Sequence, residues 1–122
     1  MDSPTTFSLA PWLSVKGSLK ALDFYKSAFG ATEAYRMDVP DGVVARLSIH
    51  GADFWLSDAG DEEEVKVPPI RMILTVPDPD ASFAKAVAAG ATVVYAVEEA
   101  YGWRIGRIVD PFGHHWEIGK PL

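Results

Sequence analysis

A chain of 122 residues with 48% hydrophobic and 23% charged side chains has the composition of one small globular domain, outside the range of disordered chains. Its formal net charge of −6 argues against nucleic-acid binding, and its lack of cysteine excludes disulfides, thiolate metal sites and cysteine nucleophiles. There is no basic leader followed by an apolar run and no apolar stretch of about eighteen residues, so we expect a cytoplasmic protein that binds neither nucleic acid nor membrane.

The first half of the chain predicts one helix among four strands. Residues 9–15 alternate between apolar and other side chains, and Pro11 among them is typical of an edge strand because proline cannot donate to a sheet. The next segment predicts a helix that is capped by Ser18 and ended by Gly30 in a left-handed conformation. Three further strands, separated by turn sequences, are predicted at residues 32–39, 43–50 and 52–57.

The second half predicts the same β-α-β-β-β order. A strand at 70–76 leads to Asp78-Pro79-Asp80, a typical helix start, and Gly90 ends that helix. Strands follow at residues 92–97, 103–109 and 115–118, the last two joined by the turn Asp110-Pro111-Phe112-Gly113. We therefore expect a single domain with one module at about 7–60, an acidic linker at about 61–69 and a second module at about 70–120.

The two helical segments are related in sequence. Residues Ala21 to Thr32 are echoed by Ala81 to Thr92 at a constant offset of sixty positions (81 − 21, 92 − 32). An offset near half the chain indicates two copies of one supersecondary unit. Because the chain is too short for two independent cores, the two copies must share their buried surface.

The duplication and several local motifs resemble the vicinal oxygen chelate superfamily, which includes glyoxalase I, extradiol dioxygenases and bleomycin-resistance proteins. The chain looks most similar to the small PhnB-like branch. The motifs are Phe24-Tyr25 followed by Phe29-Gly30-Ala31, Ala45-Arg46-Leu47-Ser48-Ile49, Leu56-Ser57-Asp58, and Asp110-Pro111-Phe112-Gly113-His114-His115-Trp116. The resemblance implies an α+β fold in which two tandem β-α-β-β-β modules form an eight-stranded open cup with the helices outside, commonly as a homodimer.

The resemblance also implies where a metal would bind. Metal-dependent members place His or Glu ligands on the cup side of the first and fourth strand of each module, and counting from Gly30 and Gly90 gives Ala10, Trp55, Arg71 and Glu117. Only Glu117 of these four is a normal ligand, and metal sites ordinarily need three or four protein donors or several waters. We therefore expect no cofactor, with Glu117 and His115 as the weak candidates for a divalent metal, and we expect His114 to bond its own loop.

The remaining residues of the predicted cup favour a small-molecule ligand. Arg71 and Glu117 are expected to pair, either as a structural ion pair or as a donor and an acceptor for a polar ligand. Trp12 and Trp55 are expected to line the cup as flat apolar walls for a planar or cationic ligand, or else to fill it, whereas Trp116 is expected in the core. The candidate ligand-binding residues, with Trp103 and Arg104 at the rim and His115 on the face of Glu117, are Trp12, Ser14, Trp55, Arg71, Trp103, Arg104, His115 and Glu117.

Three functions follow from these residues. The leading hypothesis is a metal-independent protein that binds an aromatic or cationic compound in a Trp-lined cup of a homodimer. The second is a divalent-metal-dependent lyase or dioxygenase of the glyoxalase type that uses Glu117, with His115 or a histidine from a partner subunit. The third is a dimeric scaffold without a ligand. The sequence contains no nucleophile triad, phosphate-binding glycine loop or carboxylate dyad, so no catalytic residue is assigned.

Overall fold

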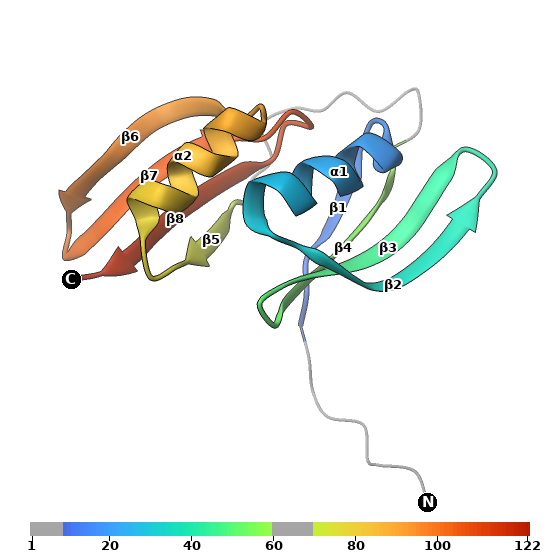
Figure 1. Ribbon diagram of the computed structural model, residues 1–122, viewed down its shortest axis with the longest axis horizontal. Coiled ribbons are helices and arrows are strands. Elements are labelled where there is room, and N and C mark those ends of the chain that lie inside the picture. The colour runs from blue at the N-terminus through green and yellow to red at the C-terminus, as the bar shows by residue number, and fades with distance from the viewer. Residues whose placement is uncertain (1–8, 60–69) are drawn as a thin grey trace, which may run out of the picture.

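The computed structural model describes residues 9–59 and 70–122, in which two four-stranded sheets each carry one helix (Figure 1). The first unit consists of β1 (Trp12–Val15), α1 (Ser18–Phe29), β2 (Thr32–Val39), β3 (Gly42–Ile49) and β4 (Ala52–Asp58). The second consists of β5 (Met72–Thr75), α2 (Pro79–Ala89), β6 (Thr92–Ala100), β7 (Trp103–Val109) and β8 (His115–Pro121). The predicted linker at 61–69 lies outside the described residues. No helix within the described ranges is long and apolar enough to cross a membrane.

The two sheets share one topology, which confirms the predicted α+β fold and the duplication. Their strand orders are β1-β4-β3-β2 and β5-β8-β7-β6. In each sheet the first strand pairs in parallel with the fourth at one edge, and the other neighbours are antiparallel. The edge strand that Pro11 predicted is confirmed, because β1 lies at one edge of its sheet. The strand predicted from residue 9 begins only at Trp12, and the last predicted strand continues to Pro121.

Glycine ends both helices, as predicted. Gly30 adopts a left-handed conformation with φ of 70°, and its amide donates to the Lys26 carbonyl at 3.0 Å. Gly90 ends α2 with φ of 123°. The carboxylate of Asp78 accepts from the amide of Ala81 at 3.2 Å and caps the start of α2. These ends are local signals, because each depends on residues within one helical turn.

The start of α1 differs from the prediction. Ser18 is buried and lies inside the helix, while Gly17 is the residue before it. The Ser18 hydroxyl donates to Asp58 and accepts from the Val43 amide, and Asp58 accepts from the amides of Gly17 and Ser18. The cap of α1 therefore comes from the end of β4, forty residues along the chain, rather than from a neighbouring side chain.

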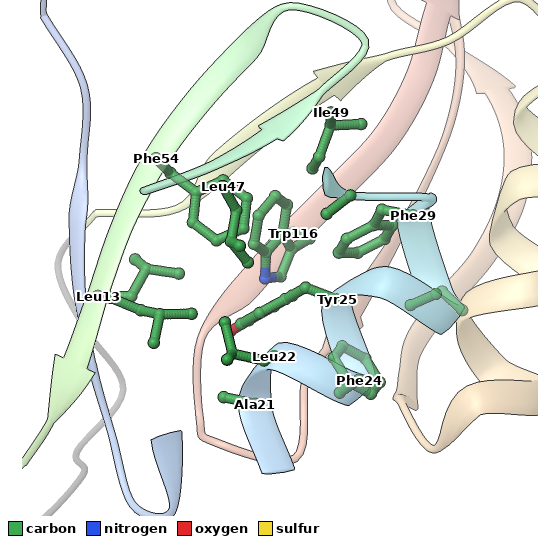
Figure 2. Packing of buried hydrophobic residues seen from close by; sticks show 14 of the residues in the cluster. Leu13, Ala21, Leu22, Phe24, Tyr25, Phe29, Leu47, Ile49, Phe54 and Trp116 are labelled. Atoms are coloured by element: carbon green, nitrogen blue, oxygen red, sulfur yellow. The ribbon is translucent and has the colours of Figure 1, made fainter. Parts of the chain in front are cut away.

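One apolar core joins the two units (Figure 2). Trp116 of β8 is 2% exposed and packs among aromatic side chains of the first unit, which confirms its predicted place in the core. Its ring centroid lies 4.7 Å from Phe29, 5.5 Å from Phe54 and 5.7 Å from Tyr25. The second unit thus contributes its largest buried side chain to a cluster built mainly by the first.

A buried carboxylate holds this contact in place. Asp110, which follows β7, is 3% exposed. Its Oδ1 accepts from the amides of Phe112 and His114, and its Oδ2 accepts from the Tyr25 hydroxyl at 2.5 Å and the Trp116 indole N–H at 2.9 Å. Burial, and then the charge and hydrogen bond of Asp110, raise the pKa of Tyr25 far above its ordinary value. Both carboxylate oxygens are satisfied, and the network ties α1 to the β7–β8 turn.

Replacing Tyr25 with Phe should lower the free energy of unfolding by about 2 kcal/mol, because it removes a hydrogen bond to a buried carboxylate without removing the ring. Equilibrium urea denaturation measures this change. The matched control is Tyr35→Phe, since Tyr35 is 45% exposed and its hydroxyl makes no hydrogen bond within the described residues. Equal stability of the two variants would contradict the role given to Asp110.

Candidate ligand-binding site

Each sheet has one face turned toward the core and one open face, defined here as the face opposite its helix. Burial alternates along β3, where Val43, Ala45, Leu47 and Ile49 are buried and the residues between them are not. The same alternation and the strand pairing assign the other residues. The open face of the first sheet carries Trp12, Ser14, Tyr35, Met37, Arg46, Asp53, Trp55 and Ser57. The open face of the second sheet carries Arg71, Ile73, Tyr95, Glu98, Trp103, Ile105, Arg107, His115 and Glu117.

Two stacked tryptophans dominate the open face of the first sheet. Trp12 and Trp55 are paired across β1 and β4, with ring centroids 5.4 Å apart and planes inclined by 5°. The Trp12 indole donates to the Ser57 hydroxyl at 2.9 Å, and the Arg46 guanidinium lies 5.6 Å from the Trp55 ring centroid. Both indoles lie on the predicted face, and they contact each other rather than forming separate walls. Trp12 nevertheless remains 53% exposed.

A pocket opens on the second sheet. It has a volume of about 430 Å³, within the range of small-molecule sites. Its wall is mostly apolar, with a polar group at one side. It is lined by Arg71, Ile73, Tyr95, Ala100, Tyr101, Trp103, Ile105 and Glu117. All of these residues come from the second unit.

Glu117 is the polar centre of the pocket. It is 9% exposed, its Oε2 accepts from Arg71 Nε at 2.9 Å, and its Oε1 accepts from the Tyr95 hydroxyl at 2.6 Å. Burial alone raises the pKa of Glu117, but these hydrogen bonds and the Arg71 charge outweigh it, so the pKa lies below its ordinary value. The pKa of Tyr95 is raised to about 12 by burial and by Glu117. At neutral pH the centre is therefore a carboxylate, a guanidinium and a neutral phenol.

His115 lies on the same face of β8 and is held by Arg107. The Arg107 Nε–H donates to His115 Nδ1 at 3.1 Å. Burial and the Arg107 charge lower the pKa of His115, so the ring is neutral at neutral pH. Because Nδ1 accepts, the single proton of the neutral ring is on Nε2.

A family model described as a glyoxalase-like domain matches residues 13–119. The chain belongs to the glyoxalase-like family. A curated relative, the uncharacterised protein Rv0887c of Mycobacterium tuberculosis, is 41% identical over an alignment 127 positions long, which covers 94% of this chain and 75% of the relative. The match places the chain in the vicinal oxygen chelate superfamily that its sequence motifs resemble.

Solved structures agree with this assignment. The Arabidopsis thaliana protein At5g48480 is 29% identical with a TM-score of 0.76, over 95% of this chain and 100% of that one. A glyoxalase/bleomycin resistance protein/dioxygenase family enzyme of Burkholderia phytofirmans is 20% identical with a TM-score of 0.76, over 91% and 95%. TnmS3, an antibiotic binding protein of a Streptomyces species, is 24% identical with a TM-score of 0.70, over 98% and 100%. The last two similarities show the shared fold.

The residues at this glyoxalase-like site do not fit a metal centre. Both oxygens of Glu117 are engaged by Arg71 and Tyr95, and Nδ1 of His115 is engaged by Arg107. The guanidinium groups of Arg71 and Arg107 beside Glu117 also oppose a cation. No group of three or more His, Cys, Asp or Glu side chains with metal-binding geometry occurs in residues 9–59 and 70–122.

The strand register confirms how the two halves correspond. Trp12 pairs with Trp55 in the first sheet, and Ile73 pairs with Glu117 in the second. Because Trp55 and Glu117 are corresponding positions of the two fourth strands, their partners Trp12 and Ile73 also correspond. Two residues earlier in each first strand, Ala10 corresponds to Arg71 (12 − 2, 73 − 2). The predicted pair of Arg71 and Glu117 is formed between neighbouring strands of one sheet.

Of the pocket residues that the sequence interpretation missed, Ile73, Ala100, Tyr101 and Ile105 line its wall, and Tyr95 belongs to its polar centre. A β-bulge after Val93 turns Tyr95 onto the open face, opposite Arg107, so simple alternation along β6 does not predict its direction. The first sheet has the same bulge after Glu33, which places Tyr35 opposite Arg46. The sequence repeat could have predicted this position of Tyr95. Tyr35 and Tyr95 have the same offset of sixty (95 − 35), and they lie three residues after the repeated segments at 21–32 and 81–92.

The predicted site residues fall into two groups. Trp12, Ser14 and Trp55 lie on the first open face, and Arg71, Trp103, His115 and Glu117 lie on the second. Since the pocket is lined by the second unit alone, one chain does not bring the tryptophan pair and the Arg71–Glu117 pair into it.

Two residue placements are corrected. Arg104 does not lie at the rim of the pocket, because its neighbour Trp103 occupies the open face and adjacent strand residues point oppositely. Its guanidinium instead forms two hydrogen bonds of 2.7 Å with Asp80 of α2. His114 does not bond its own loop through its ring, since its Nε2 lies 2.8 Å from the Ser14 carbonyl oxygen of β1.

Replacing Glu117 with Gln should reduce the amount by which the free energy of unfolding falls when the pH is lowered. The lowered pKa of Glu117 means that its contribution is complete above about pH 4.5 and is lost as pH falls through the folded-state pKa. Urea unfolding from about pH 7 to about pH 3 should give a flatter decline for E117Q than for the wild type.

The control is Glu98→Gln, at an exposed position on β6 whose side chain makes no hydrogen bond within the described residues. Parallel pH curves for the wild type and E117Q would show that the Arg71 and Tyr95 contacts do not favour the charged carboxylate.

Proposed function

We propose that this protein binds a planar aromatic small molecule without a metal, in a cup completed by a second copy of the chain. The observation that supports this proposal is that the aromatic residues and the polar residues of the expected site lie on two different sheets of the chain. One sheet exposes a stacked tryptophan pair, and the other carries a pocket with a polar centre. A planar ligand that fills the pocket presents its second face to an aromatic wall, and this arrangement suits indole stacking.

The exposed apolar side chains support a partner over both open faces. Trp12, Tyr35 and Met37 are 53%, 45% and 47% exposed on the first sheet, and Ile73 is 59% exposed on the second. Contiguous apolar surface of this kind marks interaction sites on soluble proteins. The tryptophan pair supports the aromatic class among the ligands expected from the sequence.

The proposed partner is another copy, which makes the assembly a homodimer. A two-fold axis that lays the first sheet of one copy over the second sheet of its partner generates the same contact twice, and therefore two identical cups. The antibiotic binding described for TnmS3 is a function of this fold that such a cup suits. Membership of the PhnB-like branch and a cytoplasmic location are part of the same proposal.

No observation at this site favours the glyoxalase-type metal enzyme, because each oxygen of Glu117 already accepts a hydrogen bond, one from Arg71 and one from Tyr95. The scaffold without a ligand remains as an outcome of the binding experiments.

Sedimentation velocity should show a dimer for the wild-type chain. Replacing Met37 with Asp puts a charge on the proposed interface and should shift the protein toward monomer, because burying an unpaired charge is costly. The control is Lys20→Asp on α1, an exposed position away from both open faces. A monomeric wild type at the highest concentration tested, or a dimer unaffected by M37D, would contradict this interface.

A mixed dimer tests whether each cup takes its halves from two copies. The double variant W12A/W55A loses the aromatic wall, and W103A loses part of the pocket. Either homodimer should fail to bind 2-naphthalenemethanol in isothermal titration calorimetry. Co-expression with two affinity tags isolates the mixed dimer, in which one cup is intact, so binding should return at one site per dimer.

A cup formed within one chain would leave every cup of the mixed dimer defective, and binding would stay absent. Unchanged binding by both homodimers would remove Trp12, Trp55 and Trp103 from the site. Absence of binding by the wild type would contradict the proposed function and favour a scaffold without a ligand.

A further inference from the structure

We infer that the aromatic ligand carries a carboxylate, which binds at the Arg71 end of the pocket. This inference rests on the proposed function and names the charge of the ligand for that same site. It differs from the cationic ligand expected from the sequence, because Tyr95, which the sequence interpretation missed, occupies the Glu117 oxygen that the expected pair with Arg71 leaves open.

The carboxylate of the pocket is already satisfied. Glu117 accepts from Arg71 at one oxygen and from Tyr95 at the other, at 2.9 and 2.6 Å. A cationic ligand would have to displace one of these donors or share an oxygen with it. Glu117 is therefore better suited to holding Arg71 in position than to receiving a cation.

The donors of the same face are not satisfied. Arg71 uses only Nε on Glu117, and its side chain is 50% exposed. Within residues 9–59 and 70–122 its two terminal nitrogens have no acceptor, which leaves the planar fork that matches a carboxylate in two hydrogen bonds. Among the described residues, Arg107 likewise uses only Nε, on His115. The Trp103 indole N–H makes no hydrogen bond within the described residues either, and the proton on His115 Nε2 adds a further donor on this face.

The local charge has the opposite sign to that of the whole chain. Arg71 and Arg107 give two positive charges against one negative charge on Glu117, while His115 and Tyr95 are neutral at neutral pH. Glu98 lies on the same open face, opposite Ile105, but it is exposed on the outer strand β6, so solvent and salt screen its charge more than that of the buried Glu117. The first sheet adds no net charge, since its Arg46 is 3.5 Å from Asp53. A positive site in a chain of net charge −6 selects an anion.

The apolar wall completes the recognition. Ile73, Trp103 and Ile105 line the pocket beside the polar centre, so a ring lies against them while its carboxylate meets Arg71. A volume of about 430 Å³ accommodates a bicyclic aromatic acid.

Three probes with the same ring test the charge: 2-naphthoate, the neutral 2-naphthalenemethanol and 2-naphthylmethylammonium. Calorimetry with the wild-type dimer should give 2-naphthoate an affinity at least about tenfold above the alcohol, with the ammonium compound weakest. In R71Q the advantage of 2-naphthoate over the alcohol should disappear.

Three variants separate recognition from folding. R71Q/E117Q removes both charges together, so no carboxylate is left unpaired, and should lose the preference for 2-naphthoate as R71Q does. R71K keeps the charge without the planar fork and should give an intermediate preference. R104Q is the matched control, because Arg104 is engaged by Asp80 on the helix-covered face of the same sheet; it should keep the full preference.

The outcomes distinguish the two proposals. Equal affinity for the three probes, or tightest binding of the ammonium compound, would overturn the anionic ligand and leave the proposed binding function standing. Retention of the preference in R71Q would remove Arg71 from anion recognition. Failure of the wild-type dimer to bind any of the three would contradict the proposed function itself.

Discussion

The carboxylate of Asp110 is the point on which the arrangement of the two units depends. Neither unit is large enough for a core of its own, so Trp116 of the second must be buried among Tyr25 and Phe29 of the first. A buried indole and a buried phenol each need a hydrogen-bond partner, and Asp110 accepts from both. The same contact fixes β8. With Trp116 turned into the core, Glu117 is turned to the open face.

The two open faces are divergent copies of one pattern. In each sheet a bulge presents a tyrosine opposite an arginine, as Tyr35 with Arg46 and Tyr95 with Arg107. The difference lies on the strand beside that arginine, where Trp55 occupies the place of Glu117. Trp55 therefore has an aromatic neighbour in Tyr35, whereas Glu117 binds the hydroxyl of Tyr95. One backbone geometry yields an aromatic wall in one sheet and a polar pocket in the other.

The sequence predicted those features that depend on near neighbours. Gly30, Gly90 and Asp78 act within one helical turn, and strand alternation placed Trp12, Trp55 and Glu117 on the open faces. It did not predict the cap of α1, because Asp58 reaches Ser18 only after β4 has returned beside β1. It also missed the contact of Tyr95 with Glu117, because a bulge breaks the alternation on which such predictions depend.

The unlikeness of the two faces bears on how copies of the chain would assemble. Contact between two second faces would bring Arg71 and Arg107 against the same cations of the partner, which like charges oppose. Contact between two first faces would cover the tryptophans but leave the pocket open on the other sheet. Contact between a first and a second face covers both in one symmetric step. In that arrangement the indoles close the apolar side of the pocket, and exclusion of water strengthens each hydrogen bond that Arg71 makes inside it.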